Sequence, residues 1–274
     1  MDVFDSRVCV LGEGPFWDPD RQLVRWIDGL GHRVLSRSLS GVIEEFGVPA
    51  DLGAAVLTRT GDLVLCLPDR LVRHSDGAVL AHVGGPGVRS NDAKADPAGR
   101  LWHGTMDYHE SAPIGVLYRL DPGAPDTAPQ VDHVTVSNGL GWSPDGTTMY
   151  YIDSPTHRVD RFDYDPATGE AVNRRPFAAV DDGFPDGLSV DAEGGVWVAC
   201  WGGAAVRRFS PEGTLDAVYP LPTDQVSSCA FVGPELDLLV VTTAGENRPD
   251  DPDAGLTYVL SPGVKGQPVG AFAG

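Results

Sequence analysis

The segment SPDGTTMYYID, residues 143–153, contains the pattern that decides the fold: a Pro/Gly turn followed by an apolar, aromatic run. Pro and Gly favour tight turns, and Tyr and Ile suit a buried strand. The pattern recurs as WDPDRQLVRWID (17–28), TRTGDLVLCL (58–67), ADPAGRLWHGTM (95–106), DAEGGVWVAC (191–200) and GPELDLLVVTTA (233–244). Six copies in 274 residues correspond to a period of about 46 residues.

A second pattern alternates with the first. Each copy switches between apolar and polar residues and ends in a Gly or Pro turn, which is typical of a half-buried antiparallel strand. The copies are HRVLSRSLSG (32–41), DRLVRHSDGAV (69–79), GVLYRLDPG (115–123), HRVDRFDYDPATG (157–169), AAVRRFSPEG (204–213) and GLTYVLSPG (255–263). Together the patterns predict an all-β protein, a six-bladed β-propeller with four antiparallel strands per blade. We expect one domain over residues 1–274.

Composition and charge restrict the possible partners. The formal net charge of −19 would repel nucleic acid and anionic membrane surfaces, so we expect neither as a partner. The first fifteen residues have neither a basic nor an apolar signal region, so we expect a cytoplasmic protein. Four widely spaced cysteines, Cys9, Cys66, Cys200 and Cys229, form no CxxC pair, and three of them sit in apolar runs typical of buried side chains. The sequence does not predict the oligomeric state.

One position of the repeat selects a set of polar residues. Counting back eight residues from the turn glycine of blades two to five, and from the aligned Arg21 of blade one, gives one residue per blade. In blade six the matching place falls near Ser227 or Ser228. Equivalent positions surround the axis of a propeller, so we expect this ring at the mouth of the central channel, just before the innermost strands. Its other members are Glu13, Gly53, Asn91, Asn138 and Asp186.

This ring has two interpretations. Carboxylate and amide oxygens are the ligands that hard divalent cations prefer, and two carboxylates facing one channel would repel each other without a cation between them. Alternatively, Asn and Asp beside Gly form turns by bonding to their own backbone. The residues alone leave both interpretations open.

The chain resembles the gluconolactonase and regucalcin (senescence marker protein) family of sugar lactonases. The resemblance covers nearly the whole length, through LGEGPFWDP, SNDAKADPAGRLWHGTM, SNGLGWSPDGTTMYYIDS, PDGLSVDAEGGVWVACWGG and GVKGQPVGAFAG in that order. It implies a six-bladed propeller with one catalytic divalent cation at the channel mouth. The implied metal ligands are Glu13, Asn138 and Asp186, and the implied substrate-binding residues include Arg89 and Asn91.

The family's substrate-binding glutamate follows its GTM segment. Here the sequence reads GTMDYHES, which places His109 at that position with Glu110 next to it. We therefore expect either residue to contact the substrate, and this departure bears on specificity.

These residues suit the hydrolysis of a sugar lactone to the free sugar acid. A cation can polarise the ester carbonyl and bind a water, and Asp186 is the predicted general base. Calcium is slightly favoured over magnesium, manganese and zinc. One alternative is an arylesterase or organophosphate hydrolase, although the ring contains no histidine to assist it. Another is a calcium-binding propeller without catalysis.

Several further residues have both a structural and a functional interpretation. His103 lies in an apolar strand, where a hydrogen-bonded core histidine is expected. Trp102 and Trp201 are predicted to pack between blades, with a possible second role facing a sugar. Asp153 could support the metal ligands, and Asp92 and Lys94 could pair with each other on the rim.

Overall fold

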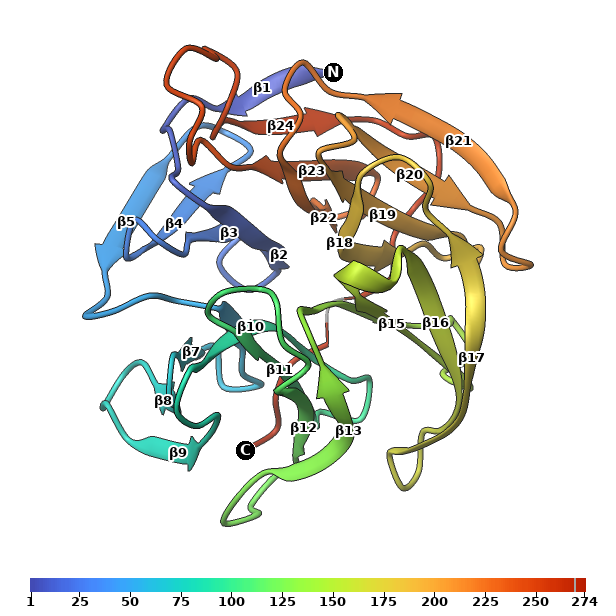
Figure 1. Cartoon of the computed structure of the whole chain (residues 1–274). Helices are drawn as coiled ribbons and strands as arrows, with labels where there is room; N and C mark the ends of the chain where they lie inside the picture. The colour runs from blue at the N-terminus through green and yellow to red at the C-terminus, as the bar shows by residue number, and fades with distance from the viewer. Residues whose placement is uncertain (269) are drawn as a thin grey trace.

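The computed structural model describes residues 1–268 and 270–274, and within them the chain forms six four-stranded antiparallel sheets around a central axis (Figure 1). This is a six-bladed β-propeller, as the repeat predicts. From the axis outward, the first three blades contain β2 (Gly12–Asp18), β3 (Leu23–Asp28), β4 (Arg33–Ser38) and β5 (Ile43–Gly47); β6 (Ala54–Leu57), β7 (Leu63–Leu67), β8 (Arg70–Arg73) and β9 (Val79–His82); and β10 (Val88–Ala95), β11 (Leu101–Asp107), β12 (Gly115–Leu120) and β13 (Ala128–Val134).

The last three blades follow the same order, except that the outermost strand of the sixth comes from the N-terminus. They contain β14 (Ser137–Trp142), β15 (Thr148–Asp153), β16 (Arg158–Asp165) and β17 (Glu170–Ala179); β18 (Phe184–Val190), β19 (Val196–Trp201), β20 (Ala205–Phe209) and β21 (Leu215–Pro220); and β22 (Val226–Val232), β23 (Leu238–Thr243), β24 (Thr257–Leu260) and β1 (Asp2–Asp5). The helix η1 (Ser154–Thr156) follows β15, and no helix in the described ranges is long and apolar enough to cross a membrane.

The two repeated patterns correspond to the second and third strands of each blade. The first pattern ends in β3, β7, β11, β15, β19 and β23, and the second contains β4, β8, β12, β16, β20 and β24. The fourth strands have exposed, irregular sequences, and the first strands are buried on both faces, so neither alternates clearly.

The ring closes through its N-terminus. Strand β1 pairs antiparallel with β24, with Val3 opposite Tyr258, so the last blade combines both ends of the chain. Pairing of the first strand onto the last sheet gives that outer edge its hydrogen bonds and joins the ends of the ring.

Large side chains fill the space between neighbouring blades. The rings of Trp102 in β11 and Trp142 in β14 meet edge to face at 6.3 Å, and Trp197 in β19 meets Phe231 in β22 at 5.5 Å. Trp102 and Trp197 are fully buried. Packing between blades is therefore confirmed for Trp102. All four cysteines are buried and free; burial was predicted for Cys9, Cys66 and Cys200.

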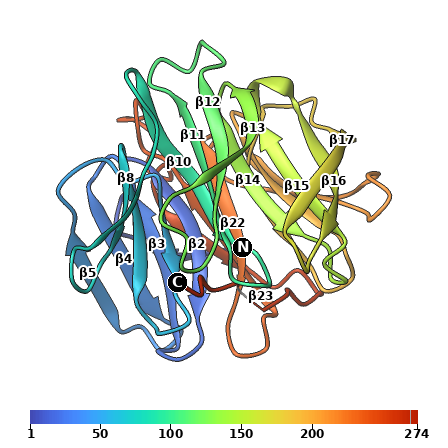
Figure 2. The ribbon, with the colours of Figure 1, turned by 90° about the horizontal axis from the view of Figure 1, so that it is seen from below.

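The C-terminal segment crosses one end of the ring (Figure 2). Its backbone bonds successively to loops of several blades, from Ala192 N to Lys265 O and from Ala273 N to Gly99 O. Phe272 is 2% exposed and packs in the core between blades two and three. The loops at this end include the turn after Asp18 in β2, so it lies opposite the end that holds Glu13. The predicted site is therefore at the end without this segment.

Candidate metal and substrate site

A break in strand pairing recurs at the same place in five of the six innermost strands. The register shifts between Glu13 and Phe16 in β2, between Ser137 and Leu140 in β14, and between Pro185 and Leu188 in β18. Strands β10 and β22 shift at the equivalent place. A β-bulge re-aims side chains and is common beside functional sites. The ring residues thus lie within the innermost strands, except Gly53, and not before them as the repeat predicts.

Glycines next to the ring allow neighbouring blades to approach closely. A Cβ on Gly139 would lie 2.6 Å from the carbonyl oxygen of Asp186 and 2.7 Å from the amide nitrogen of Leu188. A Cβ on Gly53 would lie 2.6 Å from the carbonyl oxygen of Asn91. Any side chain at these two positions would therefore push apart the strands that hold the ring, which explains why blade two contributes glycine.

The ring residues converge on a cavity of about 430 Å³ at the channel mouth. Of the predicted site residues, Glu13, Arg89, Asn91, Glu110, Asn138 and Asp186 all line it. His109 does not: its side chain is exposed on the loop after β11 and is absent from the described lining. Glu110 has a left-handed backbone, φ 56°, in this loop. The structure thus brings the glutamate, and not the histidine, to the cavity wall.

Two carboxylates in this cavity have unfavourable surroundings for a negative charge. Burial, followed by the charge of Asp92, raises the pKa of Glu13 to about 8, against the hydrogen bond that its carboxylate accepts from Gly14 N. Burial and the charges of Glu13, Asp92 and Glu110 raise the pKa of Asp186 well above the usual carboxyl range. Asp186 is 7% exposed, and within the described chain its carboxylate accepts no hydrogen bond. A buried carboxylate without a partner, close to a second carboxylate, is unfavourable unless a cation neutralises the pair, so this arrangement favours cation binding.

A chain of hydrogen bonds fixes the third proposed ligand. Asn91 Nδ2 donates to Asn138 Oδ1 at 3.0 Å, and Asn138 Nδ2 donates to Ser154 Oγ at 2.8 Å. Ser154 Oγ in turn donates to the carbonyl oxygen of Pro185 at 2.7 Å, next to Asp186. The chain begins at Arg89, whose Nη1 donates to Asn91 Oδ1 at 3.1 Å. The amide of Asn138 is therefore held in one orientation by Asn91 of the preceding blade and Ser154 of its own blade.

The donor set fits a hard divalent cation. It consists of carboxylate and amide oxygens from three different blades, the types that calcium, magnesium and manganese prefer. Nowhere in residues 1–268 and 270–274 do three His, Cys, Asp or Glu side chains form a metal-binding group. Cation binding would therefore depend on Glu13, Asp186 and the amide oxygen of Asn138 together.

Most of the other residues discussed from the sequence lie away from the cavity wall. His103 is fully buried, with its Nε2 3.0 Å from Ser90 Oγ, and burial lowers its pKa to about 3, as expected for a core histidine. Asp153 accepts hydrogen bonds from the backbone amides of Thr135 and Val136, which is a structural role. Trp201 lines the cavity and Trp102 does not.

Asp92 and Lys94 do not form the rim pair that the sequence suggested. Both are half-buried inside the channel, and the ion pairs of the described residues do not include them. Lys94 Nζ instead donates across the channel to the carbonyl oxygen of Leu188 at 2.8 Å. Lys94 follows the β-bulge of β10, between Ser90 and Ala93, and its side chain reaches Leu188 in β18.

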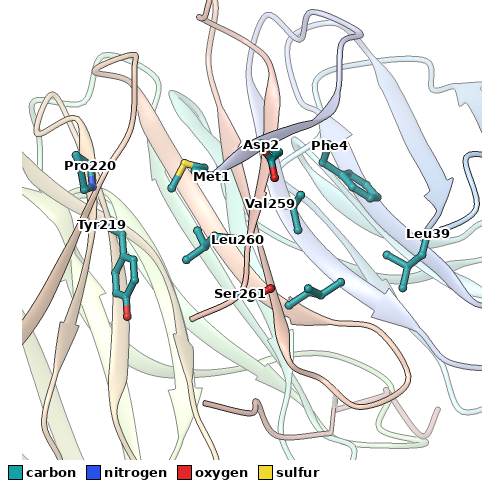
Figure 3. Close-up of a pocket in the computed structure, with 10 residues that line it drawn as sticks. Met1, Asp2, Phe4, Leu39, Tyr219, Pro220, Val259, Leu260 and Ser261 are labelled. Carbon is teal, nitrogen blue, oxygen red and sulfur yellow. The ribbon is translucent and has the colours of Figure 1, made fainter. Parts of the chain in front are cut away.

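A larger cavity lies on the outer wall beside β1 and β24 (Figure 3). It has a volume of about 680 Å³ and is lined mainly by apolar side chains, such as Phe4, Leu39 and Leu260, with Asp2 as its single charged residue. Its polar side chains are Asp2, Tyr219 and Ser261, and none of the predicted site residues lines it. The cavity at the channel mouth is smaller, but all the predicted metal-binding and substrate-binding residues except His109 line it.

Sequence reasoning missed Ser154 and the outer carboxylates Asp51 and Glu246, which also line the mouth cavity. Ser154 follows the second strand of its blade in the segment YIDSP. Its position next to Asp153, itself a candidate from the sequence, was the one feature that could have pointed to it. The two carboxylates lie in loops outside the repeated patterns, so no repeat position identifies them.

Comparisons with known proteins identify the family and agree with the fold. The family model described as "SMP-30/Gluconolactonase/LRE-like region" matches residues 11–245. Regucalcin of Xenopus laevis is 36% identical over 98% of this chain and 97% of its own length, and the putative sugar lactone lactonase YvrE of Bacillus subtilis is 33% identical over 92% and 90%. The crystal structure of a calcium-binding protein, regucalcin, from Agrobacterium tumefaciens superposes with a TM-score of 0.92 at 31% identity, covering 99% of this chain and 96% of that one.

Proposed function

The chain belongs to the SMP-30/gluconolactonase/LRE-like family, and we propose that it hydrolyses a sugar lactone to the free sugar acid using one divalent cation. The observation that carries this proposal is the pair of carboxylates, half-buried Glu13 and buried Asp186, at a cavity that also presents Arg89. A bare ion site has no need of a guanidinium, whereas an organic substrate with hydroxyl and carbonyl oxygens does. Relatives with lactonase names support the same reaction.

Glu13, Asn138 and Asp186 would hold the cation. Bound there, it would supply Lewis acidity that polarises an ester carbonyl and acidifies a water. Its identity is part of the proposal: the all-oxygen donor set favours calcium, and the Agrobacterium relative is described as calcium-binding.

Asp186 is the proposed general base. Its carboxylate accepts no hydrogen bond from the described residues, so one oxygen could bind the cation while the other accepts a proton. The proton of the attacking water would pass to an Asp186 oxygen. The oxygen of that water bonds to the lactone carbonyl carbon, the ring C–O bond breaks, and the ring oxygen gains a proton.

Arg89 and Asn91 would contribute differently. Only Nη1 of Arg89 donates to the described protein atoms, so Nε and Nη2 can bind substrate oxygens. Asn91 donates both Nδ2 protons, to Ser137 O and Asn138 Oδ1, and accepts from Arg89. Asn91 therefore mainly positions its two neighbours, with one lone pair of Oδ1 left for substrate.

The experiment measures hydrolysis of aldono-1,4- and 1,5-lactones by chelated protein resupplied with calcium, magnesium, manganese or zinc. We expect no turnover in chelator, recovery with at least one cation, and loss of at least 100-fold in kcat for Asp186→Asn. Asp181→Asn, which changes an exposed aspartate on the loop before β18, is the matched control and should retain activity.

Two results would overturn the proposal. Hydrolysis of phenyl esters in preference to every lactone would favour the arylesterase alternative, although no histidine lines the described cavity. Tight cation binding without turnover of any lactone or ester would favour a binding protein without catalysis.

A further inference from the structure

The outer rim of the cavity carries uncompensated negative charge. Asp51, Glu110 and Glu246 line the mouth outside the proposed metal ligands, on the loops before β6, after β11 and after β23. With Glu13 and Asp186 they make five carboxylates, against Arg89 as the one Lys or Arg in the described lining. The formal charge of the lining is therefore −4, and a divalent cation would leave it at −2.

No Lys or Arg of the described residues forms an ion pair with this rim. Arg89 stabilises the charged forms of Glu13 and Asp186, so its charge is directed inward. Arg248, two residues after Glu246, pairs with Asp224 at 2.9 Å. Within the described residues the Glu246 carboxylate forms no ion pair and accepts no hydrogen bond.

The other two rim carboxylates, Asp51 and Glu110, also form no ion pair with a Lys or Arg of the described residues. The Asp51 carboxylate lies 2.8 Å from His32 Nε2 and pairs with no Lys or Arg of the described residues. Glu110 lines the same cavity as Asp186 and forms no ion pair within the described residues, so its charge faces the space above the bottom of the cavity. Asp186, buried and unpartnered, is the independent sign that this cavity binds a ligand.

From this charge distribution we propose that the acidic rim restricts the site to lactones without an ionised group and expels the product. The inference rests on the proposed lactone hydrolysis. That reaction adds one water across the ring C–O bond, turning a neutral lactone into a hydroxy acid that loses a proton to solvent and becomes a carboxylate. Substrate and product thus differ by one negative charge, and only the product is repelled by the rim.

The test compares two lactones that differ at one carbon. Galactono-1,4-lactone has a hydroxymethyl group where galactaro-1,4-lactone has a free carboxylate, and kcat/KM is measured for both with the cation that supports most activity. We expect the neutral lactone to be preferred by at least tenfold at low salt. In Asp51→Asn/Glu246→Gln the preference should fall about two- to threefold for each charge removed, the size expected for unit charges about 8 Å apart in water.

Added salt and a matched control separate the rim from the overall charge of the protein. Raising ionic strength from about 0.01 M to 0.5 M should lower the preference in wild type and change it less in the double variant. Asp20→Asn/Asp237→Asn removes two exposed charges from turns at the opposite end of the ring. This control should keep the wild-type preference, because those charges lie across the whole propeller.

A binding measurement distinguishes failure of the rim from failure of the reaction. Titration calorimetry of the cation-loaded protein with galactonate should show weaker binding in wild type than in Asp51→Asn/Glu246→Gln. If no lactone is hydrolysed but galactonate binding tightens only in the rim variant, the rim inference stands and the proposed reaction fails. If lactones are hydrolysed and neither the preference nor galactonate binding differs between rim variant and control, the rim inference is wrong.

Discussion

Replacing Ser154 by alanine should weaken cation binding although Ser154 is not a proposed ligand. Ser154 is 6% exposed. Its hydroxyl accepts a hydrogen bond from Asn138 Nδ2 at 2.8 Å and donates one to the Pro185 carbonyl oxygen at 2.7 Å. Alanine removes both bonds and leaves two buried polar groups unsatisfied. At about 1–2 kcal/mol for each group, Ser154→Ala should lose about 2–4 kcal/mol of unfolding free energy.

The effect on the cation follows from the position of Ser154 in the hydrogen-bond chain. Without it the Asn138 amide can rotate, and the strand before Asp186 loses a contact with the neighbouring blade. Removing a group that orients a ligand commonly costs about 10- to 100-fold in metal affinity. We expect that loss in the dissociation constant of the cation that binds wild type most tightly, measured by titration calorimetry.

Thr105→Val separates this effect from general destabilisation. The Thr105 hydroxyl, fully buried in β11, also makes two hydrogen bonds, with the amide and carbonyl of Val116. Its loss should destabilise the metal-free protein to a similar extent in urea while leaving cation affinity unchanged. The reasoning fails if Ser154→Ala is folded and binds the cation as tightly as wild type, or if Thr105→Val weakens binding equally.

The other predictions concern pH and packing. In the folded, metal-free protein the pKa of Glu13 is raised to about 8 and the pKa of Asp186 is raised as well. The folded protein therefore keeps protons that the unfolded chain releases from about pH 4.5 upward. Stability in chelator should therefore fall between about pH 5 and 8, by at most about 1.4 kcal/mol per pH unit for each carboxyl, and saturating cation should abolish the fall. Gly187→Ala should cost about 1–3 kcal/mol and weaken cation binding, because its Cβ would lie 2.6 Å from Ser228 Cβ and displace the strand beside Asp186.

Both predictions have simple controls. Glu13→Gln should flatten the pH dependence, since carboxyls with lowered pKa values, such as Asp107 at about 2, have finished titrating below pH 5. Stability of wild type in chelator that stays level or rises from pH 5 to 8 would contradict the first prediction. Ser228→Gly should restore part of the stability lost in Gly187→Ala, and a Gly187→Ala protein as stable as wild type would contradict the second.

The repeat was sufficient to predict the fold because a turn and a buried strand recur at a fixed period. It also placed Glu13, Asn138 and Asp186 around one axis, since pseudo-symmetry converts equal spacing in the sequence into proximity in space. Their assignment as metal ligands and the role of Asp186 as a base stay predictions. The strand β1 that completes the sixth blade carries no copy of either pattern and pairs with a strand at the far end of the chain, so the sequence did not reveal it.

Loops were the least predictable part of the site. Counting along GTMDYHES put His109 at the expected place, but the left-handed backbone at Glu110 turns that neighbour to the cavity wall. The link from Asn138 through Ser154 to Pro185 joins residues 16 and 31 positions apart, and no local pattern encodes it. Side-chain direction in a loop and hydrogen bonds between blades depend on packing that spacing does not describe.

The six ring positions are equivalent in the fold but differ in chemistry because each contacts a different neighbour. Gly53 has no room for a side chain, since a Cβ would meet the backbone of Asn91. That close approach helps set Asn91 where its amide reaches Asn138, one blade further along. The same logic holds at Gly139, which allows β18 and hence Asp186 to approach β14. The bulge directs the ring side chains into the channel, and the glycines set the spacing between them. A substitution at a ring glycine should therefore affect cation binding through the adjacent blade, even where no ligand atom is removed.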